Sequence, residues 1–272
     1  MFTEKQIIMD IKEIIGNRVS VRTFDEGHEL ENKDIEIIRH SIREASTPFG
    51  GKFTIELKKF DLKGPQRPST YGTISGARWY LLMGIYEDEM SALSAGYGME
   101  KVVLKATELG LGTCWMALTF KGADFAKGVE MPSDEPLRII SPVGFPAKKR
   151  KILESITRLT LGSAKRKPMS ELFSEGNFGT PVGEDNKFYE ALSMMRLAPS
   201  AKNTQPWRAL VRGNEVWFYY VLRTEVSLLD LGIGICHFDL TLKQDGYGGC
   251  WEKSVNAPEK EGYIPVVKFT LK

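Results

Sequence analysis

The feature that most constrains the fold of this 272-residue chain is a glycine-rich string that occurs twice. In each copy a Gly-x-Gly pair leads, after a helical stretch, to a Gly-x-Gly-x-Cys-Trp string. Six residues of the first copy recur in the second at a constant offset of 136: Gly96, Gly98, Gly110, Gly112, Cys114 and Trp115 correspond to Gly232, Gly234, Gly246, Gly248, Cys250 and Trp251. Close helix packing or capping explains each glycine taken alone. The repeat indicates an ancient duplication, with two halves packed about a pseudo-twofold axis.

The order of the predicted elements repeats as well. Apolar periodicity predicts helices at 7–15, 32–42, 91–109, 188–197 and 228–244. It predicts strands at 53–60, 79–86, 114–118, 137–143, 207–211, 215–221 and 263–271. The Lys-, Gly-, Ser- and Pro-rich stretch 144–185 is expected to be an extended connection with little core of its own.

The composition excludes several classes of protein. The apolar share of 42% is that of a globular chain, and a net charge of +2 argues against a nucleic-acid or membrane partner. The opening residues carry acidic side chains within their apolar stretch and are not expected to form a secretory signal, and apolar runs such as 79–86 are too short to span a bilayer. Three cysteines without metal-ligand spacing predict neither a disulfide framework nor a metal site. We expect a cytoplasmic protein with reduced thiols.

The first polar cluster follows the predicted opening helix. Arg18, Ser20 and Arg22 alternate along the chain, so in an extended segment they face one side. Two guanidinium groups and a hydroxyl on one surface suit a phosphate and a second anionic or carbonyl acceptor. A solvated edge strand is the alternative interpretation.

The second polar cluster lies between the helix 188–197 and the strand 207–211. Pro199 cannot continue the helix, and Ser200 and Asn203 supply short polar groups to a turn. A simple turn explains the proline and the serine. The amide-rich stretch that ends in Gln-Pro-Trp (205–207) indicates recognition of a planar ligand that forms hydrogen bonds.

These two clusters resemble the signatures of a known family. Arg-x-Ser-x-Arg-x-Phe (18–24) and Ala-Pro-Ser-x-x-Asn-x-Gln-Pro-Trp (198–207) look like the two leading motifs of the FMN-dependent nitroreductases. The Gly-x-Gly-x-Cys-Trp turn resembles the family's third motif, and Lys-Arg-Lys-Pro (165–168) resembles its late basic motif. The likeness covers about residues 5–252. It implies an α+β fold with central antiparallel sheets, one FMN cofactor, transient NAD(P)H and a small-molecule substrate.

The chain departs from the family pattern in a way that suggests a fused dimer. Ordinary members are homodimers with two FMN sites, each built from both subunits. Here the first half has Arg-x-Ser-x-Arg, but its turn at 45–51 lacks Asn-x-Gln-Pro-Trp, and the second half has the reverse. We expect a pseudo-dimer: a first half at 1–150, a connecting segment at 151–184 and a second half at 185–272. It would carry one intact site, as a monomer or as a homodimer through an outer surface.

The resemblance also implies a role for each matched residue. Arg18, Ser20, Arg166 and Lys165 would bind the FMN phosphate, and Arg22 would lie at the flavin N1/O2 edge, where negative charge develops. The ring and ribityl chain would be approached by Pro199, Ser200 and Asn203. A backbone N–H of the segment Met116, Ala117, Leu118, Thr119 would contact N5, and Tyr71 and Gly72 would line the substrate face. No side chain would act as a nucleophile, and His28, His40 and His237 would not be catalytic.

The function implied is an oxidoreductase that passes electrons from NAD(P)H through FMN to a nitro-, quinone- or enone-like acceptor. One alternative is a non-catalytic protein that stores or senses FMN. Another is a family offshoot with different flavin chemistry, such as dehalogenation or flavin breakdown.

Overall fold

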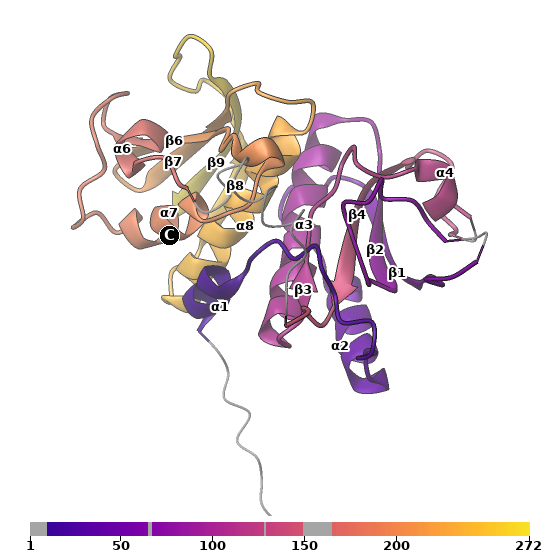
Figure 1. Ribbon diagram of the computed structural model, residues 1–272. Helices are drawn as coiled ribbons and strands as arrows, with labels where there is room; N and C mark the ends of the chain where they lie inside the picture. The colour runs from indigo at the N-terminus through magenta and orange to yellow at the C-terminus, as the bar shows by residue number, and fades with distance from the viewer. Residues whose placement is uncertain (1–9, 65–66, 128, 149–164) are drawn as a thin grey trace, which may run out of the picture.

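Two β-sheets flank a central pair of long helices in the computed structural model, which describes residues 10–64, 67–127, 129–148 and 165–272. The central helices are α3 (Glu89–Glu108) and α8 (Ser227–Gln244). Figure 1 shows the first sheet on the α3 side and the second sheet on the α8 side. The expected α+β fold with two similar halves is confirmed.

The first half carries a four-stranded antiparallel sheet in the order β1-β2-β4-β3. Its strands are β1 (Phe53–Lys59), β2 (Trp79–Ile85), β3 (Gly112–Thr113) and β4 (Leu137–Gly144). Besides α3, its helices are α1 (Ile11–Asn17), α2 (Asn32–Arg43) and the short α4 (Gly122–Phe125). The first three residues of the predicted helix 7–15 lie outside the described residues, and Asp10 caps α1 through the N–H of Lys12.

The second half carries a five-stranded sheet in the order β5-β6-β7-β9-β8. Its strands are β5 (Phe173–Glu175), β6 (Trp207–Arg212), β7 (Glu215–Tyr220), β8 (Gly249–Lys253) and β9 (Ile264–Leu271). Besides α8, its helices are α6 (Met169–Leu172), α7 (Tyr189–Arg196) and the 3-10 turn η1 (Ala201–Asn203). The order β6-β7-β9-β8 reproduces the order β1-β2-β4-β3, so the two halves share their strand connectivity.

Two sequence expectations were wrong. The stretch 144–185 was expected to be an extended connection with little core of its own, but its described part forms α6 and β5, buries Leu172 and Phe173, and pairs β5 in parallel with β6. Residues 114–118 do not form the predicted strand: β3 ends before Cys114, and the range contains a single bridge at Met116. The edge strand β8, which remains mostly exposed, was not predicted. A three-residue strand and a two-residue strand are too short to give a periodic signal.

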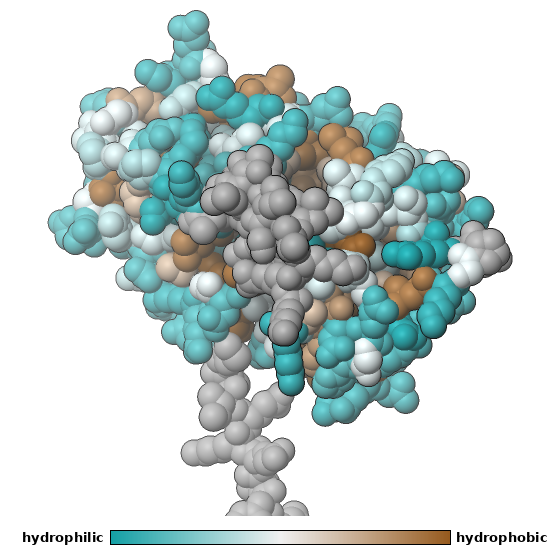
Figure 2. Space-filling view, in the orientation of Figure 1, coloured by the Kyte–Doolittle hydropathy of each residue, from teal (hydrophilic) through white to brown (hydrophobic). Residues whose placement is uncertain are grey.

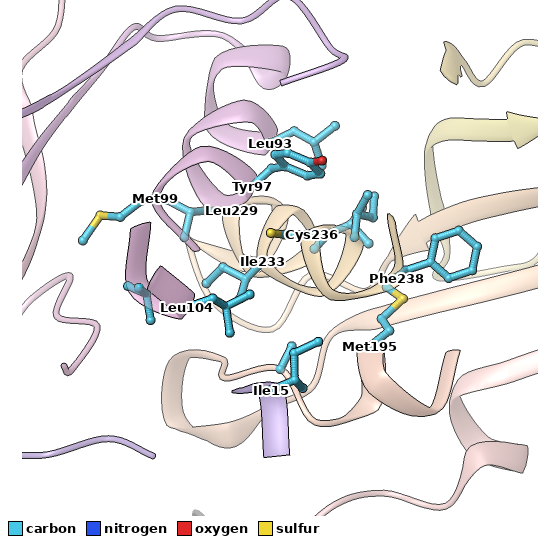
Figure 3. Close-up of a cluster of buried hydrophobic side chains, with 14 of the residues drawn as sticks. Ile15, Leu93, Tyr97, Met99, Leu104, Met195, Leu229, Ile233, Cys236 and Phe238 are labelled. Carbon is cyan, nitrogen blue, oxygen red and sulfur yellow. The ribbon is translucent and has the colours of Figure 1, made fainter. Parts of the chain in front are cut away.

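The glycines of the repeat account for the close approach of α3 and α8. A Cβ atom on Gly96 would lie 2.1 Å from the backbone oxygen of Leu229, and one on Gly232 would lie 2.1 Å from that of Leu93. These contacts are reciprocal, because Leu229 lies 136 residues after Leu93. Figure 3 shows Leu93 and Tyr97 on α3 beside Leu229 and Ile233 on α8 in one buried cluster. The crossing therefore has the local symmetry that the repeat predicts.

Both long helices also end in the same way. Gly110 and Gly246 have φ values of +74° and +83°, a conformation that glycine adopts at helix C-termini without the strain of a Cβ atom. The following N–H groups donate back to Ala106 and Leu242, each at 2.9 Å. Each half thus turns from its long helix toward the edge of its own sheet.

The face of the molecule in Figure 2 is mainly hydrophilic, with apolar residues in small separate groups. In the described residues, every helix is too short or too polar to cross a bilayer, and His, Cys, Asp and Glu side chains form no cluster suited to a metal ion. The three cysteines are not joined by disulfides.

Candidate functional site

Residues 18–24, here called the strap, connect the two halves. The strap leaves α1, whose Ile11 N–H donates to Gln244 at the end of α8 at 2.6 Å. It then reaches the first sheet, where the Val21 N–H donates to the Thr113 oxygen at 2.8 Å. Further along, the Ser75 N–H donates to the Arg22 oxygen at 2.9 Å. The strap therefore runs in an extended conformation from α1, which is bonded to the end of α8, to the first sheet (Figure 1).

The strap holds buried cationic donors without acceptors. The Arg18 side chain is only 5% exposed. Within the described residues, Arg18 Nε and Arg22 Nη1 are buried and donate no hydrogen bond. Burial lowers the pKa of Arg18, an effect that Glu100 partly offsets from 3.8 Å. A buried donor without an acceptor costs about 1–3 kcal/mol, and more when it is charged, so these nitrogens suit an anionic ligand.

The turn after α7 is strained and firmly held. Lys202, Asn203 and Gln205 have φ values of +51°, +54° and +48°, which residues other than glycine rarely adopt. The carboxylate of Asp230, on the first turn of α8, accepts the Ala201 N–H at 3.0 Å. Residues held in such conformations concentrate at functional sites.

The amide side chains of this turn contact the basic segment, residues 165–168. Asn203 Nδ2 donates to the Lys165 oxygen at 3.0 Å, and Arg166 Nη1 donates to Asn203 Oδ1 at 3.4 Å. The Lys167 N–H donates to Gln205 Oε1 at 2.8 Å. These contacts of Asn203 and Gln205 place residues 165–167 beside the turn.

Arg166 brings the two signature segments together. Burial, together with the nearby charges of Arg18 and Arg196, lowers its pKa to about 10. Its guanidinium donates to the Leu197 oxygen at 3.0 Å, at the end of α7. The guanidinium groups of Arg18 and Arg196 thus lie near that of Arg166, an arrangement of positive charge that suits a phosphate group.

The segment 116–119 requires a correction at Met116. Its N–H donates to the Ile140 oxygen at 3.0 Å, and its side chain is 3% exposed. This N–H is therefore not available to a flavin N5 atom. Ala117, Leu118 and Thr119 show no backbone N–H hydrogen bond to the described residues, and the Leu118 side chain is 75% exposed. The candidate donors reduce to these three residues.

The loop that contains Tyr71 and Gly72 borders the strap. Both residues have positive φ values, and Tyr71 is 67% exposed. The loop meets the 116–119 region where the Lys121 N–H donates to the Ser69 oxygen at 2.9 Å. It meets the strap at Ser75. Tyr71 thus lies on a loop that connects two of the predicted site segments.

The counterpart turn of the first half is closed by an aromatic side chain. The Phe49 ring contacts Trp251 edge-on, with centroids 5.4 Å apart, and Tyr97 in the same way at 5.7 Å. Trp251 is the repeat equivalent of Trp115. Phe49, in the turn that lacks the amide residues, thus packs on the tryptophan of the second half.

Two carboxylates of the site were not predicted. Glu100 and Asp230 are buried acidic residues in the long helices. Glu100 accepts hydrogen bonds from Trp115 Nε1 at 2.8 Å and contacts His237 Nε2 at 2.9 Å. Acidic residues inside otherwise apolar helices were a signal that could have identified them. His237 is buried and hydrogen-bonded.

Neither of two small pockets in the described part contains a predicted site residue. One is lined by Phe24, His28, Trp79 and Phe145, among others, and one by residues between Asp61 and Tyr80. The candidate site therefore rests on the gathered arginines and the strained turn.

The family follows from a comparison with known sequence families. The model of the family described as "Putative TM nitroreductase" matches residues 10–242, most of the chain. The chain belongs to this nitroreductase family. No curated protein matches this nitroreductase-family chain.

The chain is also similar to solved structures. A crystal structure from Thermotoga maritima MSB8, described as a "putative nitroreductase", is 20% identical with a TM-score of 0.62, and the match covers 99% of this chain and 97% of that chain. A nitroreductase family protein from Clostridium difficile 630 is 18% identical with a TM-score of 0.45, over 60% of this chain and 96% of its own. A nitroreductase with bound FMN from Bacteroides fragilis NCTC 9343 is 14% identical with a TM-score of 0.40, over 53% and 92%. The first of these matches confirms the nitroreductase fold along nearly the whole chain.

Proposed function

We propose that this nitroreductase-family protein binds one FMN where the strap meets the turn 199–205, and that it is an NAD(P)H-dependent flavin oxidoreductase. The observation that carries the proposal is the closeness of Arg18 to Arg166, together with the buried guanidinium nitrogens of Arg18 and Arg22 that lack acceptors. A phosphate would supply the missing negative charge.

FMN, when bound, supplies the hydride and electron chemistry, while the chain binds and orients the FMN and places charged groups around it. The phosphate would be held by Arg18, Ser20, Lys165 and Arg166. Arg22 would place positive charge at the N1/O2 edge and so favour negative charge there. One of the N–H groups of residues 117–119 would face N5.

The turn 199–205 would mainly position groups around the FMN. Pro199 and Ser200 would lie against the ring and ribityl chain. Asn203, whose amide contacts Lys165 and Arg166, would hold the basic segment toward the phosphate. Tyr71 and Gly72 would border the space that a nicotinamide and an acceptor occupy in turn. The acceptor would be a nitro-, quinone- or enone-like small molecule.

The matched offset of the α3–α8 crossing supports an origin by internal duplication, and Phe49 supports the loss of the second site. We therefore expect one FMN per chain. The expected location is the cytoplasm, where the three thiols stay reduced.

The first test is the visible spectrum and flavin-to-protein ratio of the purified chain. We expect a yellow protein with about one FMN per chain. A colourless protein that binds no added FMN would refute the site, and a ratio near two would refute the single-site count. Rapid bleaching by NADH or NADPH, with reoxidation by a quinone or nitroaromatic, is expected for the oxidoreductase. A flavin that neither nicotinamide reduces would favour storage or sensing.

The second test is a titration of FMN into the Arg18→Ala variant, followed by flavin fluorescence. Loss of a charge-assisted hydrogen bond of about 1.5–3 kcal/mol should weaken binding roughly ten- to a hundredfold. Asn203→Ala should also weaken binding, because it releases Arg166. Pro48→Ala, in the counterpart turn, is the control and should bind FMN normally. Full affinity in Arg18→Ala would contradict the placement of the phosphate.

A further inference from the structure

A buried polar cluster lies between the central helices, next to Arg18. Glu100 on α3 and His237 on α8 both have fully buried side chains, and Glu100 Oε1 lies 2.9 Å from His237 Nε2. The same oxygen lies 3.8 Å from Arg18 Nε. The other oxygen, Oε2, accepts from Trp115 Nε1 at 2.8 Å. One carboxyl group therefore joins both central helices, the strap and the region after β3.

The hydrogen-bond partners limit where hydrogens can sit. His237 Nδ1 lies 3.1 Å from the backbone oxygen of Met194. A carbonyl oxygen only accepts, so Nδ1 carries a hydrogen. The contact between Nε2 and Glu100 then needs a hydrogen of its own, on the imidazole or on the carboxyl group. Otherwise two lone pairs would face each other in a fully buried place.

Either arrangement gives the pair no net charge. An imidazolium with a carboxylate is neutral in sum, and so is a neutral imidazole with a carboxylic acid. Glu100 therefore cannot also neutralise Arg18. The other charged groups nearby leave this count unchanged, because burial keeps the Cys236 thiol neutral by raising its pKa and Asp239 pairs with Lys243 at 2.6 Å.

We propose that Glu100 and His237 form a positioning pair that shares one proton and orients Arg18 without cancelling its positive charge. A lone buried carboxylate at this place would pair with Arg18 and compete with any anion. The neutral pair instead leaves the charge of Arg18, beside that of Arg166, available to a phosphate. The link to FMN rests on the proposed function, whereas the proton count does not.

The proton count is tested directly by NMR of the chain with ¹⁵N-labelled histidine. The sequence has three histidines, so the His237 signals are assigned as those missing from His237→Gln. We expect a hydrogen on Nδ1, with Nε2 either protonated as well or accepting a hydrogen bond. A neutral ring with its hydrogen on Nε2 would overturn the proposal, because the pair would then carry a net negative charge. This result does not depend on FMN.

The consequence for binding is tested by FMN titration of the variants. His237→Gln leaves Glu100 as an unshared carboxylate and should weaken binding roughly ten- to a hundredfold, the effect of one charge near a phosphate at a partly shielded site. The double variant His237→Gln/Glu100→Gln restores a neutral pair and should recover most of the affinity. Asp239→Asn, a buried change away from Arg18, is the control and should bind normally.

Each outcome of the titration is informative. Unchanged affinity in His237→Gln, or no recovery in a folded double variant, would overturn the positioning role. A wild-type protein that binds no FMN would refute the proposed function instead, and the NMR result would still decide the proton count.

Discussion

Replacing Gly96 by alanine tests the central helix crossing most directly. The added Cβ atom would lie 2.1 Å from the Leu229 oxygen, more than about 1 Å short of an ordinary contact. The obstacle is backbone of the facing helix, which cannot turn away as a side chain could, so α3 and α8 must separate. Overpacking of a core costs about 1–3 kcal/mol, and this geometry places the change at or above about 3 kcal/mol.

The assay is thermal and urea unfolding followed by circular dichroism. A loss of about 3 kcal/mol should lower Tm by roughly 6–12 °C for a chain of this size. Gly232→Ala should cost about the same, since it meets the Leu93 oxygen at 2.1 Å. Gly248→Ala is the matched control, because a Cβ atom there meets nothing within 4 Å. If Gly96→Ala were as stable as Gly248→Ala, or the two central replacements differed widely, the close symmetric crossing would be refuted.

Two further predictions concern residues around the two turns. Burial raises the pKa of Asp230 from 3.8 to about 7, so its contribution to stability is full below about pH 4 and is lost as pH rises through about 7. Between about pH 4 and 7 the unfolding free energy of Asp230→Asn should depend less on pH than that of the wild-type protein. Above about pH 7 the variant should be more stable than the wild-type protein by up to about 4 kcal/mol. Parallel pH profiles of the two proteins would contradict this. Phe49→Ala should lower the free energy of unfolding in urea by about 2–3 kcal/mol, because the contacts with Trp251 and Tyr97 are lost. It should leave the FMN stoichiometry at one. Unchanged stability would show that Phe49 does not close the counterpart turn.

The sequence predicted the long and strongly periodic elements closely. The expected helix 91–109 is Glu89–Glu108, and the expected helix 228–244 is Ser227–Gln244. Elements whose stability comes from partners were missed. β5 has three residues and exists because it pairs with β6, which supplies hydrogen bonds that no local pattern reveals.

The candidate site shows the same division. The alternation of the strap residues could be read from their spacing, because it depends only on extended backbone. The burial of Glu100 between α3 and α8 could not, since it depends on how two helices cross. The use of the Met116 N–H by Ile140 likewise depends on a register between distant segments.

Because α1 is bonded to the end of α8, the segments of the two halves that meet at Arg18 belong to one chain and stay close together. In a protein assembled from separate subunits, such a meeting weakens on dilution, because association depends on concentration. Here its effective concentration is set by the chain itself. The site should therefore remain assembled at nanomolar protein, and its melting should be independent of how much protein is in the cuvette.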